Sequence, residues 1–113
     1  QAAHFNVRAQ ETLMPGATVY VQFINAEAGG RNSPTFIREP YRPHFRVGDG
    51  EYLGVGFVGG PDEPIPPGVS VNAKVIFLYS PQVNYEALQV GVQFQVLEGA
   101  RIVGVGKVTG LIQ

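Results

Sequence analysis

Hydrophobic and polar residues alternate along most of this chain, and this two-residue period is typical of β-strands. The clearest run covers residues 89–97, where one face is predicted to carry Val90, Val92, Phe94 and Val96. The same alternation predicts further strands at residues 5–9, 18–23, 45–47, 53–57, 69–77 and 102–108. Because each strand has one hydrophobic and one polar face, we expect an antiparallel sheet with one solvated side.

Glycine and proline punctuate these strands at short intervals, with 15 glycines and nine prolines in 113 residues. The segments 14–16 (Met-Pro-Gly) and 66–68 (Pro-Pro-Gly) each precede a long hydrophobic strand. Proline followed by glycine favours a tight turn, because proline fixes φ and glycine accepts a positive φ. Turn signals at this spacing are typical of sandwiches and barrels. We therefore predict an all-β fold, a closed antiparallel barrel, as a single domain over residues 1–113.

The composition narrows the class of protein further. Hydrophobic residues make up 44% of the chain and charged residues 15%, which favours a folded core over disorder. Without cysteine the chain has no disulfide, thiolate metal site or thiol nucleophile. A net charge of −1 gives no overall field that attracts nucleic acid or an anionic membrane. No hydrophobic run has the length of a membrane-spanning helix and no signal peptide is visible, so we expect a cytoplasmic location.

Candidate catalytic and metal-binding residues are few and scattered. His4 and His44 have no carboxylate or second histidine at metal-ligand spacing. Asp62 and Glu63 are adjacent, but they lie in a proline-rich stretch where a solvated turn is expected. No nucleophile elbow of the form G-x-S-x-G occurs. We predict that the protein is not an enzyme and uses no metal or cofactor. The alternative is an enzyme whose site is assembled from scattered polar residues.

Two glycine-rich segments, 54–56 and 104–107, resemble nucleotide-binding loops only superficially. The second reads Gly-Val-Gly-Lys, lacks the G-x-x-x-x-G-K-[ST] spacing and lies within a predicted strand. Its glycines are interpreted as positions of close backbone approach or of a bend in the barrel. We therefore expect no bound nucleotide.

The placement of charge is more informative than the net charge. Four of the eight cations are arginines between residues 31 and 46, with one acid among them. With Phe45 and Val47 facing the core, the strand period places Arg42, His44 and Arg46 together on the outer face. Such a strip can grip phosphates or an acidic protein surface. The alternative, which the pattern alone favours, is a solvated face whose arginine stems cover hydrophobic surface, or an internal ion pair of Arg42.

Several motifs resemble a known family. Residues 28–36 read Ala-Gly-Gly-Arg-Asn-Ser-Pro-Thr-Phe and residues 41–45 read Tyr-Arg-Pro-His-Phe. Translation elongation factor Tu typically shows Glu-Gly-Gly-Arg-His-Thr-Pro-Phe-Phe and Tyr-Arg-Pro-Gln-Phe at the opening of its third, C-terminal domain. The likeness resumes at residues 67–68 and again at 98–106, where Glu-Gly-Ala-Arg-Ile-Val-Gly-Val-Gly stands for Glu-Gly-Gly-Arg-Thr-Val-Gly-Ala-Gly. From about residue 17 to the end, the chain resembles that domain.

The resemblance implies a six-stranded, Greek-key-like antiparallel barrel. Residues 4–16 stand where the family has its interdomain connection, and we expect this segment to add a strand. In the family this domain helps to hold the T-stem backbone of aminoacyl-tRNA, meets the nucleotide-exchange factor and packs on the GTPase domain. Arg31 keeps the family's arginine at the tRNA-facing loop, whereas Asn32 and His44 stand where a histidine and a glutamine are usual. Leu53 replaces a threonine that approaches the same RNA stem. Nothing in the sequence matches the GTPase domain or the second domain.

Two functional hypotheses follow for the same set of residues. The leading one is a stand-alone, non-catalytic module that engages a protein partner, for which the resemblance suggests the translation machinery. The alternative is weak binding of tRNA or an RNA stem, because stems are recognised through phosphate and 2′-hydroxyl contacts that a few cations can make. In both, the candidate binding residues are Arg31, Asn32, Arg42, His44 and Arg46.

Overall fold

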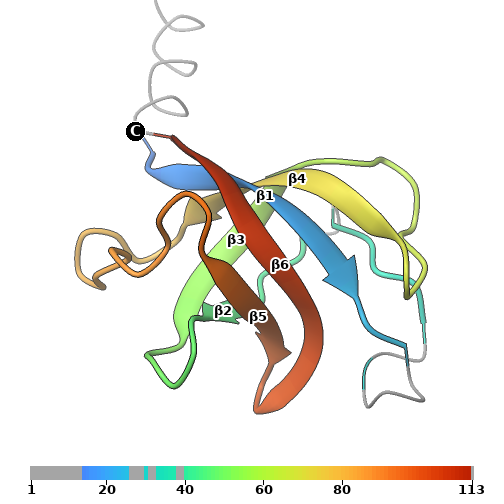
Figure 1. The fold of residues 1–113 in the computed structure, drawn as a ribbon. Helices are drawn as coiled ribbons and strands as arrows, with labels where there is room; N and C mark the ends of the chain where they lie inside the picture. Colours follow the sequence, from blue (N-terminus) through green and yellow to red (C-terminus); the bar gives the residue numbers. More distant parts are fainter. Residues whose placement is uncertain (1–13, 26–29, 31–32, 38–39, 113) are drawn as a thin grey trace, which may run out of the picture.

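The computed structural model describes residues 14–25, 30, 33–37 and 40–112; the strand predicted at 5–9 lies outside them, as do residues 4–13 of the extra N-terminal segment. The described residues form six β-strands and no helix (Figure 1). The strands are β1 (Gly16–Phe23), β2 (His44–Arg46), β3 (Leu53–Gly59), β4 (Ser70–Phe77), β5 (Gln93–Glu98) and β6 (Arg101–Ile112).

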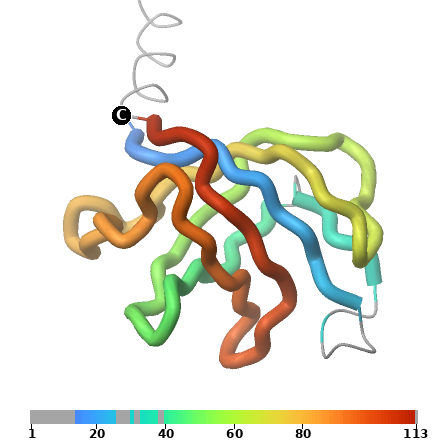
Figure 2. The backbone as a smooth tube through the Cα atoms, viewed as in Figure 1, coloured from blue at the N-terminus to red at the C-terminus, as the bar shows by residue number. Residues whose placement is uncertain are grey.

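All neighbouring strands pair antiparallel, and they close into a barrel in the order β1-β4-β3-β2-β5-β6. Consecutive strands β2, β3 and β4 are neighbours and β1 pairs with β4, which is a Greek-key arrangement. The long strand β6 runs beside β1 and also pairs with β5, and so closes the barrel (Figure 2). Closure satisfies strand edges that would otherwise be open to pairing with another chain. The predicted six-stranded, all-β antiparallel barrel is confirmed.

The barrel interior is filled by alternate residues of the strands, as the sequence pattern predicted. Val21 and Phe23 of β1 are completely buried. The rings of Phe45 and Phe94 stack with centroids 4.0 Å apart and join β2 to β5 inside the barrel. Val96, two residues further along β5, has no exposed surface. The core face predicted for the second half of this strand is therefore confirmed.

The strand predicted at 89–97 starts too early, because β5 begins only at Gln93. The preceding residues form a turn in which the Val92 amide donates to the Gln89 carbonyl over 3.0 Å. The glycine between them has a φ of 90°, a conformation that other residues rarely adopt. Val90 is consequently 60% exposed and does not join the core. Hydrophobic residues continue through this turn, so alternation alone does not detect it.

Where β6 pairs with β5, its strict alternation is interrupted. Val96 pairs with Gly104, whereas the next residue of β5 pairs with Ile102, so Val103 is the extra residue of a β-bulge. Val103 and Gly104 are consecutive and both buried, while Ile102 is exposed. The period predicted for residues 102–108 therefore holds only beyond the bulge.

The glycine-rich segment 104–107 lies within β6 and has a packing role. A Cβ atom at Gly106 would lie 2.6 Å from the Phe94 ring and 2.7 Å from the carbonyl oxygen of Tyr20. Both distances are shorter than any side chain tolerates without displacing its neighbours. The interpretation of these glycines as positions of close approach is confirmed.

Thr35 is a buried residue with an unsatisfied side chain. Its backbone N–H and C=O pair with Ile65 at 2.9 Å each, but its hydroxyl, on a side chain 1% exposed, has no hydrogen-bond partner in the described part of the chain. A buried hydroxyl without a partner is costly.

We expect Thr35→Val to leave the free energy of unfolding unchanged or raise it by up to about 1 kcal/mol in a urea titration. Thr35→Ser, which keeps the hydroxyl and removes the methyl group, should be less stable than the wild type; the reverse order would contradict this account.

Candidate binding surface

The predicted binding residues divide into two groups. Arg31 and Asn32 lie outside the described residues. Arg42 is exposed and lies just before β2, while His44 and Arg46 are half-buried within β2. The phenylalanine between the last two is buried, so the side chains alternate as the strand period predicted. The outward placement of this strip is confirmed.

Tyr52, which the sequence did not indicate, joins His44 and Arg46 into what we call the β2 cluster. The His44 and Tyr52 ring centroids are 5.9 Å apart, and the Arg46 guanidinium carbon lies 5.4 Å from the centre of the Tyr52 ring. Arg46 Nε also donates to the Gly50 carbonyl over 2.9 Å. The cation–π contact and the hydrogen bond together restrict the Arg46 side chain, which lowers the entropy it loses on binding. The tyrosine ring itself remains 43% exposed.

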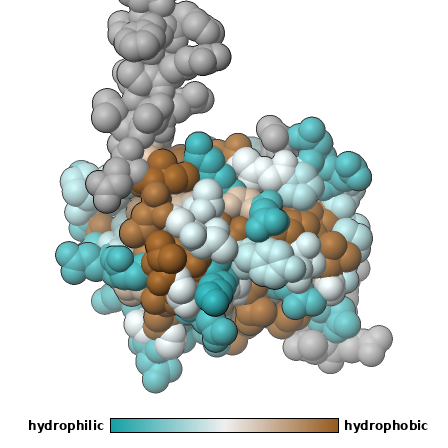
Figure 3. Space-filling view, turned by 45° about the horizontal axis from the view of Figure 1, so that its top comes forward, coloured by the Kyte–Doolittle hydropathy of each residue, from teal (hydrophilic) through white to brown (hydrophobic). Residues whose placement is uncertain are grey.

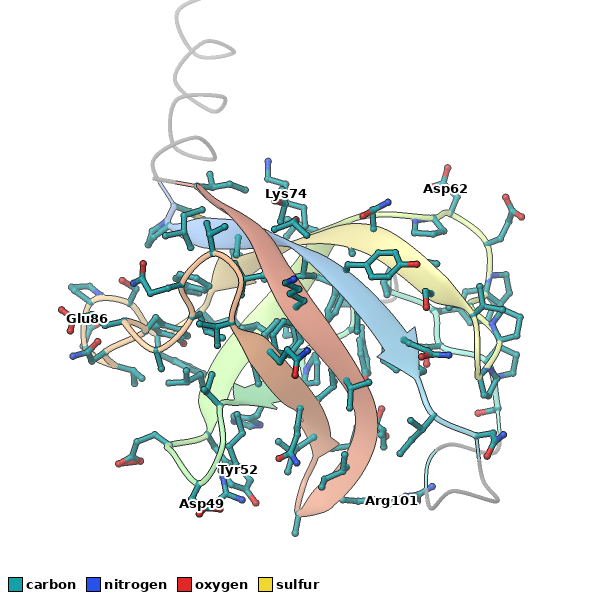
Figure 4. The ribbon with its side chains drawn as sticks, viewed as in Figure 1. Asp49, Tyr52, Asp62, Lys74, Glu86 and Arg101 are labelled. Atoms are coloured by element: carbon teal, nitrogen blue, oxygen red, sulfur yellow. The ribbon has the colours of Figure 1, made fainter. Side chains whose placement is uncertain are left out.

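Two acidic residues border this cluster. Asp49 and Glu51 are both exposed in the turn between β2 and β3. Figure 4 shows Asp49 and Tyr52 at the same end of the barrel, at this turn. Along the chain, the positive charge of Arg46 is therefore followed by two carboxylates. A ligand bearing a continuous row of negative charges would meet repulsion here as well as attraction.

The segments whose sequences resemble elongation factor Tu contact one another in the structure. The Tyr41 hydroxyl donates to Glu98 Oε2 over 2.6 Å, and an Arg101 guanidinium nitrogen donates to the Gly30 carbonyl (Figure 4 labels Arg101). These contacts tie the hairpin between β5 and β6 to the segments that precede β2. Leu53, in contrast, is 3% exposed and belongs to the core, so its side chain is not part of the surface. The motif positions therefore include residues that brace the fold.

A groove of about 650 Å³ crosses the outer wall of the barrel next to the β2 cluster. We call it the outer-wall groove. Its volume falls within the range of known ligand sites. Arg46 belongs to both the cluster and the groove, so the two form one continuous surface. The polar side chains that line the groove are Tyr20, Gln22, Arg46, Ser70, Gln93, Gln95 and Lys107.

Strand register explains why residues so distant in sequence meet in this groove. One row across the wall pairs Gln22 of β1 with Val105 of β6, Val105 with Gln95 of β5, and Gln95 with Arg46 of β2. The adjacent outward-facing row pairs Tyr20 with Lys107 and Lys107 with Gln93. Residues in register on the same face lie side by side. Closure of the barrel through β6 thus creates the surface.

The chemistry of the groove is cationic, amide-rich and partly hydrophobic. Arg46 and Lys107 line it, and no Asp or Glu of the described residues does so, although acids outnumber bases by nine to eight in the whole chain. Tyr20 is 49% exposed and Val105 44% exposed, which leaves hydrophobic surface available. Figure 3 shows one face of the barrel, on which hydrophobic residues gather in bands between polar ones. A groove of this kind suits a ligand with both anionic and hydrophobic parts.

No protein-family model matches the sequence. Within the described ranges, no group of three or more His, Asp or Glu side chains is arranged to hold a metal ion. None of the described segments forms a helix long and hydrophobic enough to cross a membrane.

Proposed function

We propose that this barrel is a non-catalytic binding module that engages a protein partner through the β2 cluster and the outer-wall groove. The proposal rests on one observation: Arg46 belongs both to the β2 cluster and to the outer-wall groove, so the two form one surface. Together they present cations, amides and the exposed rings of Tyr20 and Tyr52, with a buried core beneath. Arginine and tyrosine are the side chains that most often anchor protein interfaces. A rigid barrel also holds such side chains in place before the partner arrives.

The resemblance to the third domain of elongation factor Tu supports the same proposal, because that domain works by docking onto proteins and tRNA. It suggests a partner from the translation machinery. Likeness of fold alone does not fix function, so the partner has to be identified by experiment.

The second candidate function is binding of an RNA stem, which the cations and rings around Arg46 favour. Two to four phosphate contacts would give a weak complex with a log–log salt slope of about −2 to −4. The acidic residues Asp49 and Glu51, which are exposed in the turn after Arg46, and the net charge of −1 favour a protein partner instead.

The proposal is tested by affinity capture with the full chain, with and without ribonuclease, followed by reconstitution from purified components. We expect one polypeptide to co-purify regardless of ribonuclease. Arg46→Ala, and Arg42→Ala at the exposed position two residues before His44 of the β2 cluster, should each weaken the reconstituted complex by about five- to thirtyfold, the effect of losing an interface arginine. Lys74→Ala is the matched control, because this exposed lysine of β4 lies outside the groove. Binding is measured by calorimetry.

A titration with tRNA decides between the two candidates. If the partner is a protein, tRNA binding at physiological salt should be negligible. A submicromolar complex with tRNA whose salt slope falls by about one in Arg46→Ala, and likewise in Arg31→Ala, would overturn the proposal in favour of RNA.

A further inference from the structure

We propose that the outer-wall groove takes an extended acidic segment of the partner protein, with Arg46 and Lys107 as its two anion-binding positions. This inference rests on the proposed function and specifies the chemistry of the partner.

The two cations flank the same strand. Arg46 is in register with Gln95 on one side of β5, and Lys107 is in register with Gln93 on the other side. They are therefore two strands apart across the wall and two residues apart along it. With strands about 4.8 Å apart and about 3.3 Å per residue, their backbones are separated by roughly 12 Å. An extended segment covers that distance in three or four residues, so carboxylates at that interval match both cations.

The amide side chains favour a peptide over a phosphate backbone. Gln22 Nε2 donates to the Gly68 carbonyl over 2.8 Å, which leaves its amide oxygen as an acceptor at the groove. Gln93 and Gln95 add two more amides, each with donors and an acceptor. A peptide backbone offers N–H donors to such acceptors, whereas a phosphodiester offers only acceptors. The exposed surfaces of Tyr20 and Val105 suit the aliphatic side chains between the carboxylates.

The charges around the groove limit how many negative charges the bound segment can carry. Among the described residues, only Arg46 and Lys107 provide positive charge in the lining, and Asp49 and Glu51 follow Arg46 in the adjacent turn. A polyanion such as single-stranded RNA would place further phosphates near these carboxylates. A segment with two separated carboxylates satisfies both cations without this repulsion.

The test uses the full chain and a fluorescein-labelled synthetic peptide in which two glutamates are separated by three residues of serine and valine. Fluorescence anisotropy should show saturable binding that weakens at least about tenfold when both glutamates are replaced by glutamine. Arg46→Ala and Lys107→Ala should each lower the affinity by about three- to tenfold. Lys74→Ala is the matched control and should bind as the wild type does; Figure 4 shows Lys74 and Tyr52 at opposite ends of the barrel. Because Lys107 and Lys74 are exposed, their variants should keep the wild-type melting temperature. Arg46→Ala loses the contacts with Tyr52 and Gly50 and should lower the melting temperature by only a few degrees, with the protein still folded.

Three results would overturn the inference. The first is equal affinity for the glutamate and glutamine peptides. The second is an effect of Lys74→Ala as large as that of Lys107→Ala. The third is tighter binding of a single-stranded RNA that displaces the peptide. The proposed function is judged separately, by the captured protein. If Arg42→Ala and Arg46→Ala weaken that complex while Lys107→Ala does not, the module binds protein but the groove is not where the acidic segment lies.

Discussion

Replacing Phe94 by alanine should lower the free energy of unfolding by about 3–5 kcal/mol, the usual cost of removing a buried aromatic side chain. The Phe94 side chain is 3% exposed and stacks on Phe45 with an interplanar angle of 16°. Its ring also occupies the space left by the missing side chain of Gly106. The surrounding strands belong to a closed barrel and have little freedom to collapse into the cavity. Urea-induced unfolding followed by circular dichroism measures the loss.

Gln93→Ala is the matched control, because the two residues are adjacent in β5 and point to opposite faces. Gln93 is exposed on the outer wall, so this substitution should change the free energy of unfolding by less than about 0.5 kcal/mol. Similar losses in the two variants would mean that the register of β5 against β6 is assigned to the wrong face.

The fold was predictable from the sequence because buried hydrophobic residues occur at every second position of the strands. Phe23, Phe45 and Val96 alternate with polar residues and are all buried in the structure. The failures occur where the chain departs from regular pairing. In the turn that exposes Val90, the Gly91 amide donates to the Val108 carbonyl of β6 over 2.8 Å, and the bulge at Val103 arises where β6 pairs with β5. Hydrophobic alternation along the chain does not encode these contacts between strands.

The candidate site was predictable only in part, for a similar reason. Arg42, His44 and Arg46 follow one another at strand spacing, so their common face could be read from the chain. Tyr52 lies immediately before the next strand, β3, and Lys107 lies far away in sequence. They meet Arg46 through the hairpin turn and through the order β2-β5-β6 in the closed barrel. A glutamine or lysine on an outward face carries no signal of a groove until that order is known.

Tyr85→Phe should lower the free energy of unfolding by about 1–3 kcal/mol, because it removes only a hydroxyl that makes two hydrogen bonds. That hydroxyl donates to the Gly54 carbonyl over 2.6 Å and accepts from the Tyr79 amide over 3.1 Å. The ring stacks on Phe77 with centroids 4.5 Å apart, a contact that phenylalanine keeps. The variant thus measures the contribution of the hydrogen bonds that connect the loop after β4 to the barrel. Tyr79→Phe is the matched control and should be close to neutral, since the Tyr79 side chain is 53% exposed.

The same hydroxyl should make stability depend on alkaline pH. Burial raises the pKa of the Tyr85 phenol above its usual 10.0; the hydrogen bond from the Tyr79 amide opposes this shift, and the charge of the Tyr79 side chain adds to it. The unfolded chain then releases this proton at a lower pH than the folded protein does. The stability contributed by neutral Tyr85 is therefore fully present below pH 10 and is lost as pH rises toward the higher folded-state pKa. Urea titrations between about pH 8 and pH 11 should show the stability difference between the wild type and Tyr85→Phe shrinking at the alkaline end. A difference that stays constant or grows across this range would show that the buried phenol is not held in its neutral form.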